Sequence, residues 1–169
     1  LLNSFLESFV LCLDSKIDSA WKYECMGFLV NIWKKIKIKP NILHIPKILF
    51  NPSLSVFNES DSVKTQNLLN LRFEAIKRIL FLSPESICDI LSSTIQYPLL
   101  FTEIIELIVL TKERVKRILG KNSKFINKIR FISLQLQHEE ISGKLSKNIV
   151  ENARLSIFKL LNLLKQYSS

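Results

Sequence analysis

The sequence predicts an all-α protein. Only three glycines and five prolines occur in 169 residues, which is too few for the many turns of an all-β chain. Apolar residues recur at helical spacing in several long stretches, and no stretch argues convincingly for a strand. We expect seven to nine helices that are joined by mostly short connections and packed in antiparallel pairs.

Two arrangements of these helices fit the pattern. Successive helix pairs of roughly 40 residues, each with a wide apolar face, are typical of an α-solenoid segment of the armadillo or HEAT kind. The alternative is an irregular helical bundle. No repeat signature can be aligned along the chain, so the sequence indicates an architecture and not a family.

Composition favours a globular protein inside the cell. Hydrophobic residues make up 47% of the chain and charged residues 23%, and no uninterrupted apolar run reaches the length of about 20 residues that spans a membrane. The three cysteines, Cys12, Cys25 and Cys88, have no metal-type spacing and are expected as buried free thiols in a reducing compartment. We therefore expect a nuclear or cytoplasmic protein without a membrane partner.

Residues 1–169 suit a single helical domain, with a possible subdivision at a polar loop over 51–62. The chain lacks an initiating Met and starts inside an apolar pattern, so we interpret it as part of a longer protein. Its first elements are expected as helices over 2–13 and 16–36. The basic run 34–39 resembles a nuclear-localisation patch only weakly, and a solvated helix end is the preferred interpretation.

The next strong helix is predicted over 63–82. Arg72 falls inside its apolar arc, and a guanidinium there must either extend outward to water or form a structural ion pair; a ligand contact is the less favoured alternative. The triplet Ser83-Pro84-Glu85 predicts a helix start, with Ser as N-cap, Pro in the first position and an acid in the first turn. That helix should end near residue 92.

A central helix is predicted over 102–119. Thr102 is the expected N-cap, and Gly120 is expected in the left-handed conformation that ends a helix. Acidic residues lie near its start and basic residues near its end, as the helix dipole favours, and Glu113 can pair with Arg117 one turn on.

The last part of the chain predicts two more helices. Asn122 or Ser123 should cap a helix that reaches about Gln135, and 138–143 is expected as a loop or one short turn. The final strong helix is expected over 146–167.

The most conspicuous surface feature is the basic stretch over 112–130, with eight basic residues and one acidic residue. This is more positive charge than the helix dipole requires. The candidate residues for binding a partner or nucleic acid are Lys112, Arg114, Lys116, Arg117, Lys121, Lys124, Lys128 and Arg130.

Motifs for catalysis and cofactor binding are lacking. The three glycines stand apart, so no phosphate-binding loop is evident, and the two histidines, His44 and His138, are remote from each other. A Ser or Cys nucleophile would have no recognisable base. We expect no enzyme, no cofactor, no metal and no small-molecule substrate.

Two functions remain. The first is a protein-interaction scaffold, a subunit of a multiprotein complex in the nucleus or the cytoplasm. Several apolar residues fall off the main core stripes and need a second helix layer or a partner to bury them. These are Val30, Phe81, Leu110, Leu155, Phe158 and Leu163. The alternative is contact with nucleic acid through 112–130, with little sequence specificity. The two functions can coexist.

Overall fold

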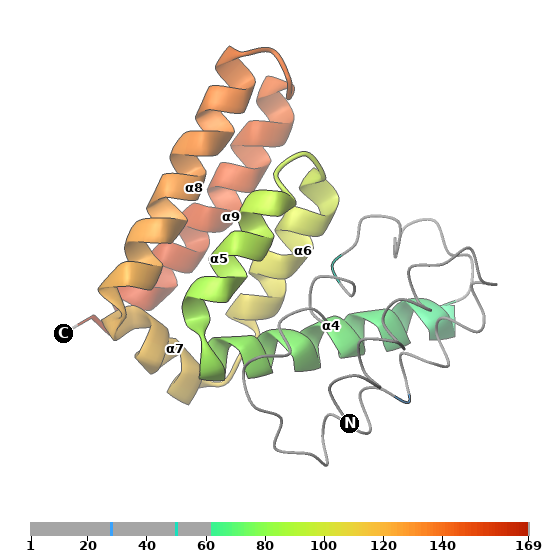
Figure 1. The fold of residues 1–169 in the computed structure, drawn as a ribbon, viewed down its shortest axis with the longest axis vertical. Helices are drawn as coiled ribbons and strands as arrows, with labels where there is room; N and C mark the ends of the chain where they lie inside the picture. The colour runs from blue at the N-terminus through green and yellow to red at the C-terminus, as the bar shows by residue number, and fades with distance from the viewer. Residues whose placement is uncertain (1–27, 29–49, 51–61, 169) are drawn as a thin grey trace, which may run out of the picture. The chain divides into compact units, whose positions relative to one another are not determined.

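The structure, a computed structural model, describes residues 28, 50 and 62–168. Over 62–168 the chain is helical and contains no strand, which confirms the all-α prediction for this part. The predicted helices over 2–13 and 16–36 lie outside the described residues, apart from the helical Phe28. The helices are α4 Ser62–Leu82, α5 Pro84–Ser93, α6 Pro98–Val109, α7 Glu113–Lys121, α8 Ser123–Ile141 and α9 Lys147–Lys165 (Figure 1).

The chain divides into two compact units, Leu1–Ala75 and Ile76–Ser169. The boundary falls inside α4, so the last turns of α4 and all of α5–α9 belong to the second unit. The predicted subdivision at 51–62 stays a prediction, because 51–61 lie outside the described residues.

Helix α4 agrees with the predicted helix over 63–82. Leu68, Ile76 and Leu80 of the predicted apolar arc are buried, and Leu69 is half-buried. Arg72 is only 1% exposed. Its side chain therefore does not extend to water, and that alternative is wrong.

The predicted continuous helix over 102–119 is wrong. Helix α6 begins at Pro98, so Thr102 lies inside it, and it ends at Val109. The Thr111 hydroxyl donates a hydrogen bond of 2.6 Å to the carbonyl of Ile108, and this side-chain bond competes with the helical ladder. Lys112 is extended and becomes the N-cap residue of α7. The break is not visible in the sequence pattern because the apolar arc continues across it.

The left-handed glycine is Gly143 and not Gly120, for which that conformation was predicted. Gly120 lies within α7, and the positive φ of 75° belongs to Gly143. A Cβ atom on Gly120 would lie 2.6 Å from the carbonyl oxygen of Leu164 and 2.9 Å from Cβ of Tyr167. Gly120 is therefore needed for the close approach of α7 to the end of α9, and the predicted left-handed conformation is wrong.

Helix α8 is longer than predicted. Asn122 caps it through its side chain, which accepts a hydrogen bond of 3.0 Å from the backbone N–H of Phe125, as expected. The helix continues past Gln135 to Ile141, so the predicted loop at 138–143 is wrong over its first part. Gly143 N–H then bonds to Glu140 and Lys144 N–H to Glu139, the pattern in which a left-handed glycine ends a helix.

In the second unit, helices α8 and α9 follow one another through a short turn, and Arg154 of α9 meets Ser133 of α8. Helix α9 also lies beside α6 and α7, and α8 beside α5. The contacts along α5 follow the same chain order as their partners at the start of α8 and along it: Glu85 meets Asn122, Asp89 meets Lys128 and Ser92 meets Gln135. These two helices therefore run in the same direction (Figure 1).

The core of the second unit lies between these helices. Each helix contributes an apolar stripe with the spacing of one helical face, and the stripes of α6, α8 and α9 are the most completely buried. Their buried members are Phe101, Ile104, Ile108, Phe125, Ile129, Ile132, Leu136, Ala153, Ile157, Leu160 and Leu164. This core fixes α8 and α9, whose outward residues form the surfaces described below.

Candidate functional site

The eight candidate basic residues are distributed over the N-cap of α7, α7 itself and the first half of α8. Lys116 is half-buried, and the other seven are exposed. Arg114, Arg117 and Lys121 have the spacing i, i+3, i+7, so they share one face of α7, while Leu119 and Gly120 on the opposite side are buried. We call these three residues the α7 basic face.

The predicted pair of Glu113 and Arg117 is confirmed, with 3.9 Å between Glu113 Oε2 and Arg117 Nη2. Both side chains are more than two-thirds exposed, and ion pairs of this kind stabilise a protein by about 0–1 kcal/mol. Glu113 also accepts a hydrogen bond of 3.1 Å from the Tyr167 hydroxyl. This bond raises the pKa of Tyr167 above its ordinary value and ties the end of the chain to α7.

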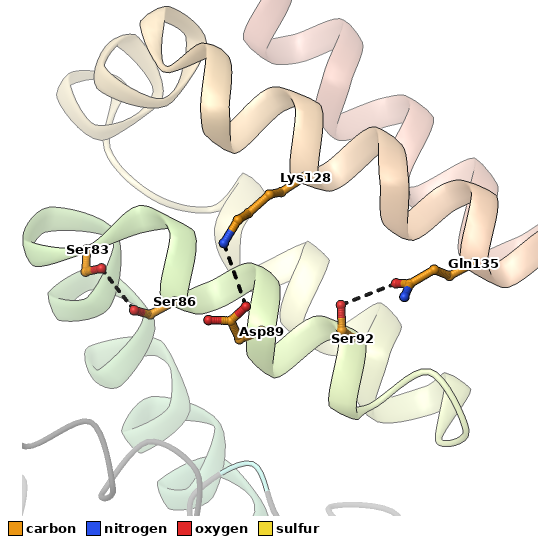
Figure 2. Close-up of polar contacts among 6 residues, drawn as sticks. All are labelled: Ser83, Ser86, Asp89, Ser92, Lys128 and Gln135. Atoms are coloured by element: carbon orange, nitrogen blue, oxygen red, sulfur yellow. Dashed lines mark hydrogen bonds and ion pairs between the residues drawn. The ribbon is translucent and has the colours of Figure 1, made fainter.

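The basic residues of α8 do not extend the α7 basic face as one surface. Lys128 points toward α5, where its Nζ lies 3.8 Å from Oδ1 of Asp89 (Figure 2). Arg130 follows two residues later, and residues at that spacing do not share a helix face. The structure therefore brings Arg114, Arg117 and Lys121 together and separates Lys128 from Arg130.

A line of polar contacts joins α5 to α8. Figure 2 shows Asp89 facing Lys128 and the Ser92 hydroxyl facing Gln135, at 3.4 Å. The line starts with Asn122, which donates a hydrogen bond of 3.2 Å to Glu85. Ser83, the expected cap of α5, instead pairs its hydroxyl with that of Ser86.

These contacts lower the pKa of Glu85. The pKa of its carboxyl lies below the ordinary value, first because of a backbone hydrogen bond at the start of α5 and then because of the bond from Asn122. Lys124 and Lys128 act in the same direction. Part of the positive charge of 112–130 is therefore matched within the protein by the acids of α5.

A groove of about 440 Å³ runs beside these polar contacts; we call it the α5–α8 groove. Phe131 and Leu134 of α8 line it, and each is 60% exposed. Ile95 contributes a buried apolar side chain, and Gln96 donates a hydrogen bond of 2.9 Å to Glu139 at one end. The groove thus combines two large exposed apolar side chains with a polar border.

A second groove, of about 350 Å³, lies between α8 and α9; we call it the α8–α9 groove. Leu155 and Phe158 line it and are 50% and 60% exposed. Ser133 of α8 and Arg154 of α9 meet across it, with 3.4 Å between Arg154 Nε and the serine hydroxyl. Both grooves therefore flank α8, one on each side of its exposed surface.

The described residues offer few groups that are suited to catalysis. They contain no group of three or more side chains that could hold a metal ion. Cys88 is buried, and burial raises the pKa of its thiol to about 12, so the thiol stays protonated and is a poor nucleophile. No helix within 62–168 is long and apolar enough to cross a bilayer.

The predicted off-stripe residues behave as expected where they are described. Phe81, Leu110, Leu155 and Phe158 are exposed, Leu163 is half-buried, and Val30 lies outside the described residues, as does the basic run 34–39. Sequence reasoning missed Phe131, Leu134 and Ile141, which are exposed on α8. All three fall off the stripe that starts at Phe125; Phe131 and Leu134 lie within the predicted helix, and Ile141 is recognised only when the helix is continued to residue 141.

No protein-family model, curated protein or solved structure matches this chain.

Proposed function

We propose that this chain is a non-catalytic protein-interaction scaffold that binds a partner protein through the exposed apolar residues of α8 and α9. The observation that carries the proposal is the placement of Phe131, Leu134, Leu155 and Phe158 along two grooves that flank α8. Large exposed apolar side chains gathered at a groove mark interaction sites more often than ordinary surface.

We extend the proposal to the architecture. The pairs α5–α6 and α8–α9 would be two units of a helical repeat of the armadillo or HEAT kind. Its support is that the first helices of the two pairs, α5 and α8, run in the same direction and lie side by side, while the second helices, α6 and α9, also pack together. Stacked helix pairs in repeat proteins contact their neighbours in this way and form extended binding surfaces.

Recovery of a partner tests the proposal. The full chain is used as bait in nuclear and cytoplasmic extracts, with and without nuclease, at low and high salt. We expect a protein partner that resists nuclease and salt and is lost with Phe131→Ser combined with Phe158→Ser. Both residues are exposed, so circular dichroism and thermal unfolding of this variant should match the wild type.

The control variant reverses the α7 basic face: Arg114→Glu, Arg117→Glu and Lys121→Glu. It should keep the partner. If the apolar variant also keeps every salt-resistant partner, or if no protein is recovered at all, the scaffold proposal is wrong.

Contact with nucleic acid is a second candidate, and the α7 basic face is the observation that favours it. Three cations on one exposed helix face suit a phosphate backbone, and such binding would fall steeply with salt. Fluorescence anisotropy with a labelled single-stranded oligonucleotide at two salt concentrations tests it. The triple Glu variant should lose the binding, and unchanged affinity in this variant would contradict the candidate.

A further inference from the structure

We infer that the α8–α9 groove binds an amphipathic helix of a partner protein whose apolar stripe is flanked by acidic residues. This inference rests on the proposed scaffold function and names the chemistry of the partner.

The shape of the groove favours a helix. Exposed residues of α9 form a stripe with the spacing i, i+4, i+7, i+11, and it consists of Glu151, Leu155, Phe158 and Asn162. The groove runs between two antiparallel helices, and a helix lies in such a groove by fitting its side-chain ridges between theirs. The other neighbours of these two helices are helices as well, since α5 lies against α8 and α6 against α9.

The charge of the border favours an acidic partner. Arg154 lines the groove, and its hydrogen bond within the described residues goes to the neutral Ser133. Arg130 is exposed one turn before Ser133, and Lys159 is exposed next to Phe158. Among the described residues, none of these three cations has an acidic side chain within ion-pair distance.

The acidic residue at the groove already forms an ion pair within the protein. Glu151 is the acidic residue among the lining residues, and its Oε1 lies 3.8 Å from Nζ of Lys147. The apolar centre at Leu155 and Phe158 therefore has beside it Arg154, a cation without an acidic partner among the described residues. Arg130 and Lys159 lie close in sequence to the lining residues Ser133 and Phe158. A helix with a Leu or Phe stripe and Glu or Asp beside it complements both properties, and charge complementarity of this kind selects among partners.

The α5–α8 groove does not carry the same argument. No Lys or Arg is among its lining residues, and its acidic lining residue Glu139 pairs with Lys144 at 3.8 Å. That groove can take part in binding but does not select an acidic partner.

Designed peptides test the inference. Three labelled 18-residue helical peptides share one leucine stripe and carry Glu, Gln or Lys beside it, and a fourth has the Glu composition with the stripe scrambled. Their affinity for the full chain is measured by fluorescence anisotropy at about 0.15 M salt. We expect the Glu peptide to bind about tenfold more tightly than the Gln peptide and the Lys and scrambled peptides to bind least.

Two charge-matched variants locate the binding. Arg130→Glu with Arg154→Glu, and Arg114→Glu with Arg117→Glu, each lower the formal net charge from +9 to +5, because each pair of reversals removes four charges. The first should weaken the Glu peptide about tenfold, and the second should keep its affinity within about threefold. Phe158→Ser should weaken both the Glu and the Gln peptide.

The outcomes separate this inference from the scaffold function. Equal binding of the Glu and Gln peptides, both lost with Phe158→Ser, overturns the acidic partner and leaves the scaffold standing. Equal weakening by the two charge variants also overturns the inference, because the attraction is then only that of net charge. If no peptide binds, a helix in this groove is wrong, and partner recovery from extracts decides the scaffold function separately.

Discussion

The two sides of α8 differ in whether their charged groups have partners within the protein. On the side of α5, Lys128 and Gln135 each meet a polar partner from that helix, and Glu139 meets Gln96 in the turn that follows it. On the side of the α8–α9 groove, Leu155 and Phe158 remain half or more exposed, and the hydrogen bond of the cationic Arg154 among the described residues goes to Ser133. The polar groups on the first side are matched within the protein, while Phe131 and Leu134 stay exposed there. The second side combines exposed apolar residues with the cation Arg154, which suits a partner that carries acidic groups.

The largest expected effect on the free energy of unfolding comes from a substitution in the buried apolar stripe of α8. Leu136 is 1% exposed and Leu134 is 60% exposed on the same helix. Leu136→Ala should lower the free energy of unfolding by about 2–5 kcal/mol, because it removes buried atoms and leaves a cavity. Leu134→Ala should change it by less than about 0.5 kcal/mol. Urea unfolding measures both, and equal losses would contradict the assignment of Leu134 to the surface.

The next largest effects on stability are expected at two glycines, Gly120 in the last turn of α7 and Gly143 just after α8. Gly120→Ala should destabilise the protein by about 1–3 kcal/mol, because the added Cβ meets the backbone of α9. Gly143→Ala meets nothing within 4 Å and should cost about 1–2 kcal/mol through its positive φ. Thermal unfolding compares them, and a stabilised Gly120→Ala variant would contradict the close approach of α7 and α9.

A smaller effect is expected at Asn122, where the polar line between α5 and α8 begins. Asn122→Ala should cost about 0.5–2 kcal/mol, because the cap of α8 is lost. It also removes one cause of the lowered pKa of Glu85. The stabilisation that the ionised Glu85 provides is present above the pKa of the unfolded chain and is lost as pH falls through the lower folded pKa.

The variant should therefore lose less stability than the wild type when urea unfolding is repeated at acidic pH. An unchanged pH dependence would show that Asn122 does not act on Glu85.

The smallest effect is expected for the exposed pair of Asp89 and Lys128. Their side chains are 75% and 48% exposed, so Asp89→Asn should change the free energy of unfolding by about 0–1 kcal/mol. A double-mutant cycle with Lys128→Gln measures the pair. A coupling well above 1 kcal/mol would mean that the polar contacts hold α5 against α8 and do not merely set its position.

Local signals in the sequence identified those helices whose start and extent depend on residues within the helix itself. Pro84 and Asn122 stand at helix starts as their chemistry requires, and α4 and α9 agree with their apolar periodicity. The break at Thr111 was missed because its hydroxyl bond to Ile108 leaves the apolar pattern unchanged. Gly120 was misassigned because its role depends on Leu164 and Tyr167, which lie far along the chain.

The candidate site was predictable only where the exposure of a residue follows from the periodicity of its own helix. The sequence identified Leu155 and Phe158 as apolar residues off the core stripe, and both are exposed. It treated 112–130 as one basic surface, but the position of α5 determines that Lys128 is paired, whereas Arg130 has no ion pair among the described residues. Such pairing depends on contacts between helices and cannot be read from spacing within one helix.

Hydrogen–deuterium exchange of the full chain with and without its recovered protein partner tests the central claim most directly. We predict slower exchange in the segments of α8 and α9 that border the grooves, residues 130–138 and 151–161, with α7 unchanged. Slower exchange confined to α7, or no change in α8 and α9 at saturating partner, would contradict the claim that these apolar surfaces bind the partner.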